Sequence, residues 1–292
     1  MFEPLQYEFF RRGLIAAGLV GALCGLLGVY IVLRRMSYIG HGLSHSVFGG
    51  AVVSYVMSFN FYVGASIWGF LSALLINATT RRRQVIAADA AIGVITTASF
   101  ALGVALISRE KTFTRNFDAA LFGNILGVTN DDLLAIGLVT ALTAVMFATL
   151  YRKFLFLTFD AEVARFYGVQ TDWLETLFTL ILAATIVVSM QVMGVTLIAA
   201  AIVIPPVTAR LLSHSFKQVL ILSVLIGAAC GLAGMYLSYY IDVSSGASIV
   251  LLAAGVFAAA MAYASLRDRV AAARGIAPER AAMLSGQADL FE

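Results

Sequence analysis

Apolar runs of about 20 residues recur along nearly the whole chain, and this feature most constrains its fold. An α-helix needs about 20 predominantly apolar residues to cross the hydrocarbon core of a bilayer. Only 12% of the 292 residues are charged, whereas a soluble domain carries about 25% charged residues. The runs are continuous rather than alternating, which argues against a membrane β-barrel. The sequence therefore predicts an all-α polytopic membrane protein.

The apolar runs predict a bundle of eight or nine transmembrane helices. The third span and the pair divided at Gly194 leave the count open. Residues 119–128 are apolar but too short to cross, so we expect a re-entrant or interfacial helix there. The candidate spans are residues 13–33, 39–58, 61–80, 89–108, 131–150, 174–193, 195–213, 217–238 and 246–266. Residues 1–266 thus form the transmembrane domain, and the polar residues 267–292 are expected to form a partly disordered cytoplasmic tail.

Lys and Arg residues indicate the orientation of the chain, because cytoplasmic loops carry an excess of them. Placing the polar loop Tyr151–Asp172 in the cytoplasm and alternating outward puts 14 of the 19 basic residues inside. The N-terminus is then outside and the C-terminus inside, although Arg11 and Arg12 oppose this assignment. The net charge of +3 therefore reflects residues that flank spans rather than a nucleic-acid partner.

Small residues recur at three- and four-residue spacing on two of the spans. Such faces let helix backbones approach closely, which indicates a tightly packed bundle or a homodimer. Cys24 and Cys230 lie inside apolar runs, and we interpret them as small core residues rather than as a disulfide or metal pair. The small-residue faces are Gly18, Gly21, Gly25 and Gly28 in the first span, and Gly227, Gly231 and Gly234 in the eighth.

Two histidines lie in the stretch SYIGHGLSHSVFGG, near the start of the second span. His41 and His45 are four residues apart, so on a helix they share one face. Neutral imidazoles at this spacing can bind one divalent metal ion, and ionisable residues inside a bilayer often mark a substrate path. The alternative is a pair of polar side chains hydrogen-bonded to neighbouring helices. Two ligands do not complete a metal site.

The polar loop Phe156–Asp172, FLTFDAEVARFYGVQTD, predicts a short helix between two spans. Asp160 is placed to cap its N-terminus, with Glu162 in the first turn. Gly168 is placed to end it.

This short helix is amphipathic. Phe159, Val163 and Phe166 fall on one face, while Glu162 and Arg165 are expected to be solvated. Such a helix is suited to docking into the groove of a partner protein, or to lying on lipid headgroups. The residues alone leave both interpretations open.

Pro205 and Pro206 interrupt the apolar stretch GVTLIAAAIVIPPVTARLL. Proline removes a backbone donor and kinks a helix, and broken helices often line translocation paths in carriers. A structural kink is the alternative. The chain has no G-x4-G-K-[ST] phosphate-binding motif, so we do not expect it to hydrolyse ATP.

These motifs together resemble the permease subunit of bacterial ABC importers for divalent transition metals, the family that takes up manganese, zinc or iron. The resemblance covers about Gly13–Ala264. It rests on six motifs in order: VLRRMSYIGHGLSHSVFGG, AAIGVITTASFALGVALIS, LFGNILGV, FDAEVARFYGV, GVTLIAAAIVIPPVTARLL and YYIDVSSGASIVLL.

The resemblance implies a homodimer of permeases around a central path in the bacterial cytoplasmic membrane. Two cytoplasmic ATP-binding subunits and an extracytoplasmic metal-binding protein would be its partners. Phe159–Val169 resembles the family's coupling helix, and Ala164 and Gly168 match its Ala-x3-Gly spacing, which favours the docking interpretation. The coupling residues it implies are Phe159, Asp160, Glu162, Ala164, Arg165 and Gly168.

The histidine stretch departs from the family pattern at two positions. His45 and Ser44 fall on the family's histidine and serine, whereas His41 replaces its usual aspartate and Gly49 a frequent proline. Imidazole nitrogen suits zinc, copper or iron better than manganese.

The resulting hypothesis is an ATP-driven importer subunit for zinc or manganese, with iron third, that holds no permanent cofactor. His41 and His45 would form a transient metal site or gate. One alternative is an ABC permease for a metal chelate such as a siderophore or corrinoid. The other is a stand-alone secondary carrier, which would need ionisable residues within its spans to couple an ion gradient.

Overall fold

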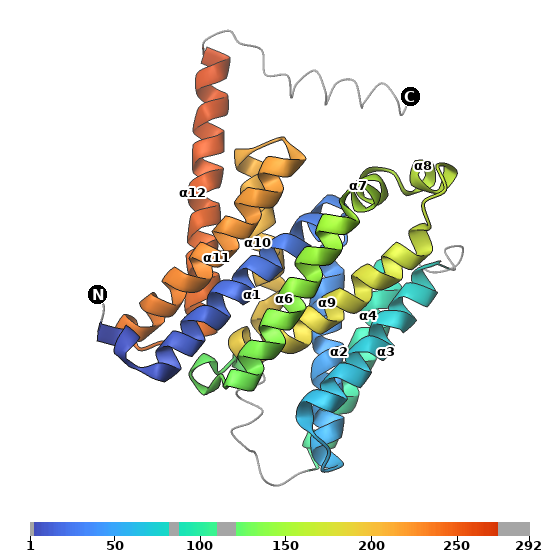
Figure 1. Cartoon of the computed structure of the whole chain (residues 1–292), viewed down its shortest axis with the longest axis vertical. Helices are drawn as coiled ribbons and strands as arrows, with labels where there is room; N and C mark the ends of the chain where they lie inside the picture. The colour runs from blue at the N-terminus through green and yellow to red at the C-terminus, as the bar shows by residue number, and fades with distance from the viewer. Residues whose placement is uncertain (1–2, 82–87, 110–120, 274–292) are drawn as a thin grey trace.

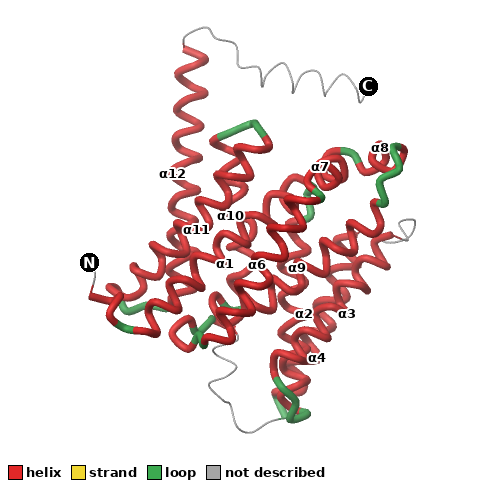
Figure 2. The backbone as a smooth tube through the Cα atoms, in the orientation of Figure 1, coloured by secondary structure: helices red, strands yellow, loops and turns green. Residues whose placement is uncertain are grey.

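The computed structural model describes residues 3–81, 88–109 and 121–273, and within these ranges every regular element is a helix (Figure 2). The long helices are α1 (Glu8–Leu33), α2 (Ser37–Val56), α3 (Phe61–Arg81), α4 (Ala88–Ile107), α6 (Asn130–Thr149), α9 (Thr171–Met193), α10 (Val195–Leu212), α11 (Phe216–Ile241) and α12 (Ser245–Ala273). The short ones are η1 (Glu3–Gln6), η2 (Ile125–Gly127), α7 (Tyr151–Phe159) and α8 (Ala161–Phe166).

The long helices correspond one to one with the predicted spans, which confirms the helical polytopic fold. In the described part of the chain, eight of them are long and apolar enough to cross a membrane. The third predicted span is one of these, and the chain divides at Gly194 into α9 and α10 as expected. The helix outside this set is α2, which has 20 residues but is rich in serine, glycine and histidine.

The bundle has two distinct ends, and the described long helices run between them in alternating directions (Figure 1). α7 and α8 lie at the upper end of the view, where α6 ends and α9 begins. The N-terminus lies at the lower end. α2 occupies the interior, where it packs against α3, α4, α9 and α10. The core is therefore built around the long helix that lies outside the set of candidate spans in the described residues.

Glycines bring α1 and α11 into direct backbone contact. A Cβ atom added at Gly21 would lie 2.2 Å from the Gly227 carbonyl oxygen, and one added at Gly227 would lie 2.1 Å from the Gly21 oxygen. The Ser223 hydroxyl donates a hydrogen bond of 2.7 Å to the Gly25 carbonyl across the same interface. The predicted small-residue faces thus pack against each other within one chain. Cys24 and Cys230 are free thiols, and both are buried.

The chain segment before α6 packs onto the corner between α9 and α10. The Asn124 amide donates to the Gln191 carbonyl at 2.8 Å, and the Thr196 hydroxyl donates to the Leu121 carbonyl at 2.7 Å. The described part of the predicted short helix at 119–128 is the 3-10 turn η2 and its flanks, and residues 119 and 120 lie outside the described residues.

The last helix is longer than its predicted span. α12 continues to Ala273, seven residues past the boundary at 266, and its upper end stands clear of the neighbouring helices (Figure 1). The start of the predicted polar tail is therefore helical. Residues 274–292 lie outside the described residues, so the expectation of disorder there stays a prediction.

Candidate functional site

α2 leaves one narrow face uncovered in its first half, and this face carries both histidines. Tyr38 and His41 are exposed and His45 is half-buried. The residues between them are buried. Positions 38, 41 and 45 follow the three- and four-residue spacing of one helix face. The predicted shared face of His41 and His45 is therefore present.

The two imidazoles point at each other. Their Nε2 atoms lie 3.3 Å apart, and the ring centroids are 4.6 Å apart with the planes at 87°. Two nitrogens bound to one tetrahedral zinc ion at 2.0–2.1 Å would lie about 3.3–3.4 Å apart. The same separation fits a hydrogen bond between neutral imidazoles, so the geometry suits both an empty and a metal-bound pair.

Neighbouring groups contact the His45 ring and the His41 backbone. The Phe100 ring from α4 meets the His45 ring edge-on at a centroid distance of 4.8 Å. The Ser44 hydroxyl donates a hydrogen bond of 2.7 Å to the His41 carbonyl. Gly49 allows this close approach of α4, because a Cβ there would lie 2.3 Å from the Ser99 carbonyl oxygen.

The pair supplies at most two protein ligands from this chain. Across residues 3–81, 88–109 and 121–273, no group of three or more His, Cys, Asp or Glu side chains is placed to hold a metal ion. A stable site would need more donors, so the arrangement suits transient coordination.

The second candidate site is the short helix α8, which begins where the sequence predicts. The Asp160 carboxylate accepts hydrogen bonds of 2.9 Å from the Glu162 and Val163 amides. This is an N-cap, and it satisfies two of the helix's free donors.

α8 ends at a left-handed glycine. Gly168 has φ of +79°, and its amide bonds to the Arg165 carbonyl at 3.0 Å while the Val169 amide bonds to the Ala164 carbonyl at 3.0 Å. Ala164 is the one buried residue of the helix. The predicted Ala-x3-Gly pair therefore forms the buried side and the stop of α8.

Apolar side chains on α8 and its flanks are exposed at the end of the bundle. Phe166 is 88% exposed, Tyr167 73% and Phe159 67%. Beside them, an open hollow of about 490 Å³ lies between α7 and the start of α9. It is lined by Lys153, Tyr167, Gly168, Val169, Gln170, Trp173 and Leu174. Sequence analysis missed Lys153 and Trp173, because only the fold brings these two residues to one hollow.

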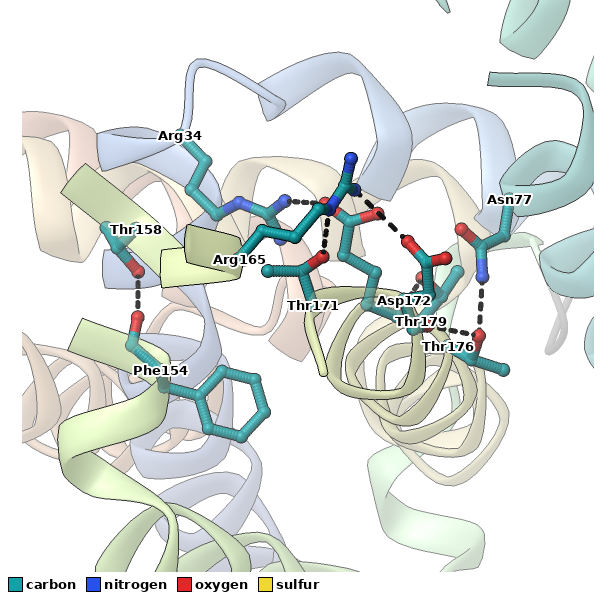
Figure 3. A network of polar contacts seen from close by, with 10 residues as sticks. Arg34, Asn77, Phe154, Thr158, Arg165, Thr171, Asp172, Thr176 and Thr179 are labelled. Atoms are coloured by element: carbon teal, nitrogen blue, oxygen red, sulfur yellow. Dashed lines mark hydrogen bonds and ion pairs between the residues drawn. The ribbon is translucent and has the colours of Figure 1, made fainter. Parts of the chain in front are cut away.

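Arg165 does more than face solvent. Its Nε donates to the Thr171 hydroxyl at 3.1 Å, and its Nη2 lies 3.3 Å from the Asp172 carboxylate (Figure 3). α8 is thereby bonded to the first turn of α9.

A further ion pair lies at the same end of α9. Arg34, the C-cap of α1, donates from Nη2 to the Glu175 carboxylate at 2.7 Å. The two residues are 141 positions apart, and no sequence motif connects them.

Pro205 and Pro206 are both buried inside the continuous helix α10. Pro206 lacks the amide that would bond to the Ile202 carbonyl. That carbonyl instead meets α1, where a Cβ added at Gly28 would lie 1.9 Å from its oxygen. The prolines therefore lie in the helix interface, and their predicted role in lining a path stays a prediction.

Comparisons with known proteins match this architecture. The model of the ABC 3 transport family matches residues 6–264. A manganese transport system membrane protein, MntC, from Halalkalibacterium halodurans is 37% identical over 264 residues, which cover 89% of each chain. A probable iron transport system membrane protein from Haemophilus influenzae is 34% identical over 269 residues, which cover 92% of this chain and 98% of the relative.

A solved structure agrees with the sequence relatives. The structure described as PsaBC from Streptococcus pneumoniae in complex with Fab has a TM-score of 0.79 and 32% identity, and the match covers 89% of this chain and 93% of that one. Its likeness spans the bundle that holds both candidate sites. The chain is thus a multi-pass helical membrane protein, and it belongs to the ABC 3 transport family.

Proposed function

We propose that this chain is the membrane-spanning permease subunit of an ATP-driven importer of divalent metal ions. The observation that carries the proposal is the His41–His45 pair, whose Nε2 atoms lie 3.3 Å apart on the uncovered face of α2. Relatives covering nearly the whole chain are named for manganese and iron transport.

The histidine pair gains its function in a homodimer. Two copies facing each other across α2 would bring four imidazoles to one path, which supplies the donors that a single chain lacks. The hydrogen bond between the two imidazoles would compete with an ion for the same Nε2 atoms, so the ion is held loosely and can leave. With Tyr151–Asp172 in the cytoplasm, His41 and His45 lie in the cytoplasmic half of α2.

α8 is the element that would couple the path to ATP hydrolysis. The exposed aromatic residues on α8 and its flanks, the adjoining hollow and the bonds to α9 suit a docked ATP-binding subunit. An extracytoplasmic binding protein would deliver the ion at the opposite end of the bundle.

The proposal leaves manganese, iron and zinc as candidate ions with different support. The names of the two relatives reported above refer to manganese transport and to iron transport. His41 favours iron or zinc, since imidazole nitrogen is a poorer ligand for manganese than a carboxylate.

Whole-cell metal content tests the proposal. Cells that express the chain with its ATP-binding subunit and binding protein would be compared with cells that carry His45→Ala, by elemental mass spectrometry. His214→Ala is the matched control, because His214 is an exposed histidine in the α10–α11 loop. We expect a selective gain of one metal that is lost in His45→Ala and kept in His214→Ala.

Other outcomes separate the rival functions. No metal gain from the intact system would refute the importer proposal. A gain that persists when the ATP-binding subunit is inactivated would indicate a stand-alone secondary carrier. A gain seen only when the metal is supplied as a siderophore or corrinoid, and unaffected by His45→Ala, would indicate a chelate permease.

A further inference from the structure

The first two turns of α9 hold three other elements of the chain. Arg165 from α8 bonds to Thr171 and Asp172, Arg34 from the end of α1 bonds to Glu175, and the Asn77 amide from α3 donates to the Thr176 hydroxyl at 2.9 Å. Figure 3 shows Arg34, Arg165 and Asn77 all pointing to this end of the helix. A displacement of α8 would therefore move the part of α9 that is hydrogen-bonded to α1 and α3.

Of the two ion pairs among these contacts, Arg34–Glu175 is the more buried and the stronger. Its side chains are only 12% and 22% exposed, whereas those of Arg165 and Asp172 are 67% and 61% exposed. A charge-assisted hydrogen bond of 2.7 Å is short and strong, and removal of one partner leaves the other charge poorly solvated. Exposed pairs contribute little by comparison.

The connection from Arg34 to the histidines is short and contains a backbone hydrogen bond. Only residues 34–36 separate α1 from α2, and the Met36 amide bonds back to the Ile31 carbonyl at 2.9 Å. Arg35 has φ of +55°, a left-handed conformation that a non-glycine residue adopts only where surrounding contacts hold it. His41 follows in the second turn of α2. The start of α2 is thus tied directly to the end of α1.

We propose that Glu175 is a positioning residue that, through Arg34, ties the displacement of α8 to the positions of His41 and His45. When a docked subunit moves α8, the first turn of α9 follows, because only residues 167–170 separate the two helices and Arg165 bonds to Thr171. Glu175 carries the α1–α2 corner with it, and the two imidazoles shift relative to those of the facing copy. This inference rests on the proposed function, which supplies the subunit that moves α8.

The test follows movement at α2 without any metal. Tyr38→Cys places a thiol on the histidine face, in a background with Cys24→Ala and Cys230→Ala. The chain would be purified with its ATP-binding subunit in lipid nanodiscs, and the rate of labelling by a water-soluble maleimide would be measured with and without ATP plus vanadate. Glu175→Gln is introduced into this background, because glutamine keeps an acceptor for Arg34 and removes the charge.

Two further variants serve as the control and the rescue. Glu8→Gln removes an exposed carboxylate that pairs with Arg12, at a distance of 3.9 Å between their charged atoms, at the other end of the bundle. The exchanged pair Arg34→Glu with Glu175→Arg restores opposite charges in reversed order.

We expect nucleotide to change the labelling rate about fivefold or more in the parent and in Glu8→Gln, the lower end of typical coupling between sites. In Glu175→Gln the change should shrink to less than about twofold, and the exchanged pair should recover it. A full nucleotide response in Glu175→Gln would overturn the inference. If Glu175→Gln does not fold, the exchanged pair decides, and a missing response there would also overturn it.

Failure of the proposed function looks different in the same experiment. A chain that retains no ATP-binding subunit on purification would refute the proposed function itself. A chain that binds the subunit but shows no nucleotide response at position 38 would refute only the link through Glu175.

Discussion

Gly21→Ala should loosen the bundle at the contact between α1 and α11. The added Cβ would lie 2.2 Å from the Gly227 carbonyl oxygen, whereas ordinary contact begins at 3.4 Å, so the helices would have to separate by about 1.2 Å. Backbone lies on both sides of this contact, and no side chain can rotate away. The separation would also stretch the hydrogen bond from Ser223 to the Gly25 carbonyl.

Three free-energy contributions determine how much Gly21→Ala destabilises the protein. Overpacking of this kind costs about 1–3 kcal/mol, and a hydrogen bond between membrane helices contributes about 0.6 kcal/mol. Alanine recovers about 1 kcal/mol relative to glycine inside a helix. The net loss in the free energy of unfolding is therefore about 0.6–2.6 kcal/mol.

The chain carries its own reporters for this measurement. Cys24 and Cys230 are buried one turn from Gly21 and Gly227, on the two helices that the substitution forces apart. Heating the detergent-solubilised protein with a thiol-reactive coumarin maleimide would report their exposure as fluorescence. We expect the transition to fall by about 2–4 °C per kcal/mol lost.

Gly137→Ala is the matched control, since Gly137 lies in the middle of α6 and a Cβ there would meet nothing within 4 Å. We expect this control to raise the free energy of unfolding by about 0.5–1 kcal/mol. A Gly21→Ala protein that is as stable as the Gly137→Ala protein would show that α1 and α11 do not touch through their backbones.

Three further predictions concern α8. Asp160→Ala removes the N-cap, which costs about 0.5–2 kcal/mol, and should reduce copurification of the ATP-binding subunit; Asp131→Ala, an exposed carboxylate at the other end of the bundle, should not. Gly168→Ala, at φ of +79°, should cost roughly 1–2 kcal/mol in backbone strain and speed hydrogen exchange over residues 161–169, while Gly137→Ala leaves that exchange unchanged. Phe166→Ser, at a side chain 88% exposed, should change stability by less than about 0.5 kcal/mol yet weaken copurification; unchanged copurification would argue against docking through α8.

The spans could be predicted because lipid imposes a strict length and polarity on any segment that crosses it. Their ends were less predictable. α1 begins at Glu8, five residues before its apolar run, and includes Arg11 and Arg12. Long basic side chains can extend along a helix toward the interface, so charge does not mark where a helix stops.

Local features of the sites were also predictable, since they depend on spacing alone. The shared face of His41 and His45 and the cap at Asp160 involve residues within four positions of each other. The ring of Phe100 against His45 and the Arg34–Glu175 pair were not predictable, because they join distant segments. Charged residues are common near the ends of spans, and the sequence around such a residue does not identify its partner.

α2 shows why hydropathy and burial have to be considered together. Among the long helices of the described residues, it alone falls outside the set apolar enough to cross a membrane, yet α3, α4, α9 and α10 cover most of it. Its polar residues, such as Ser44 and Ser46, are buried against protein rather than lipid. The face that stays uncovered carries His41 and His45, and imidazoles facing hydrocarbon would be costly. The missing cover must therefore be polar, and a facing second copy with a water-filled path between the two is the environment that the proposed function provides.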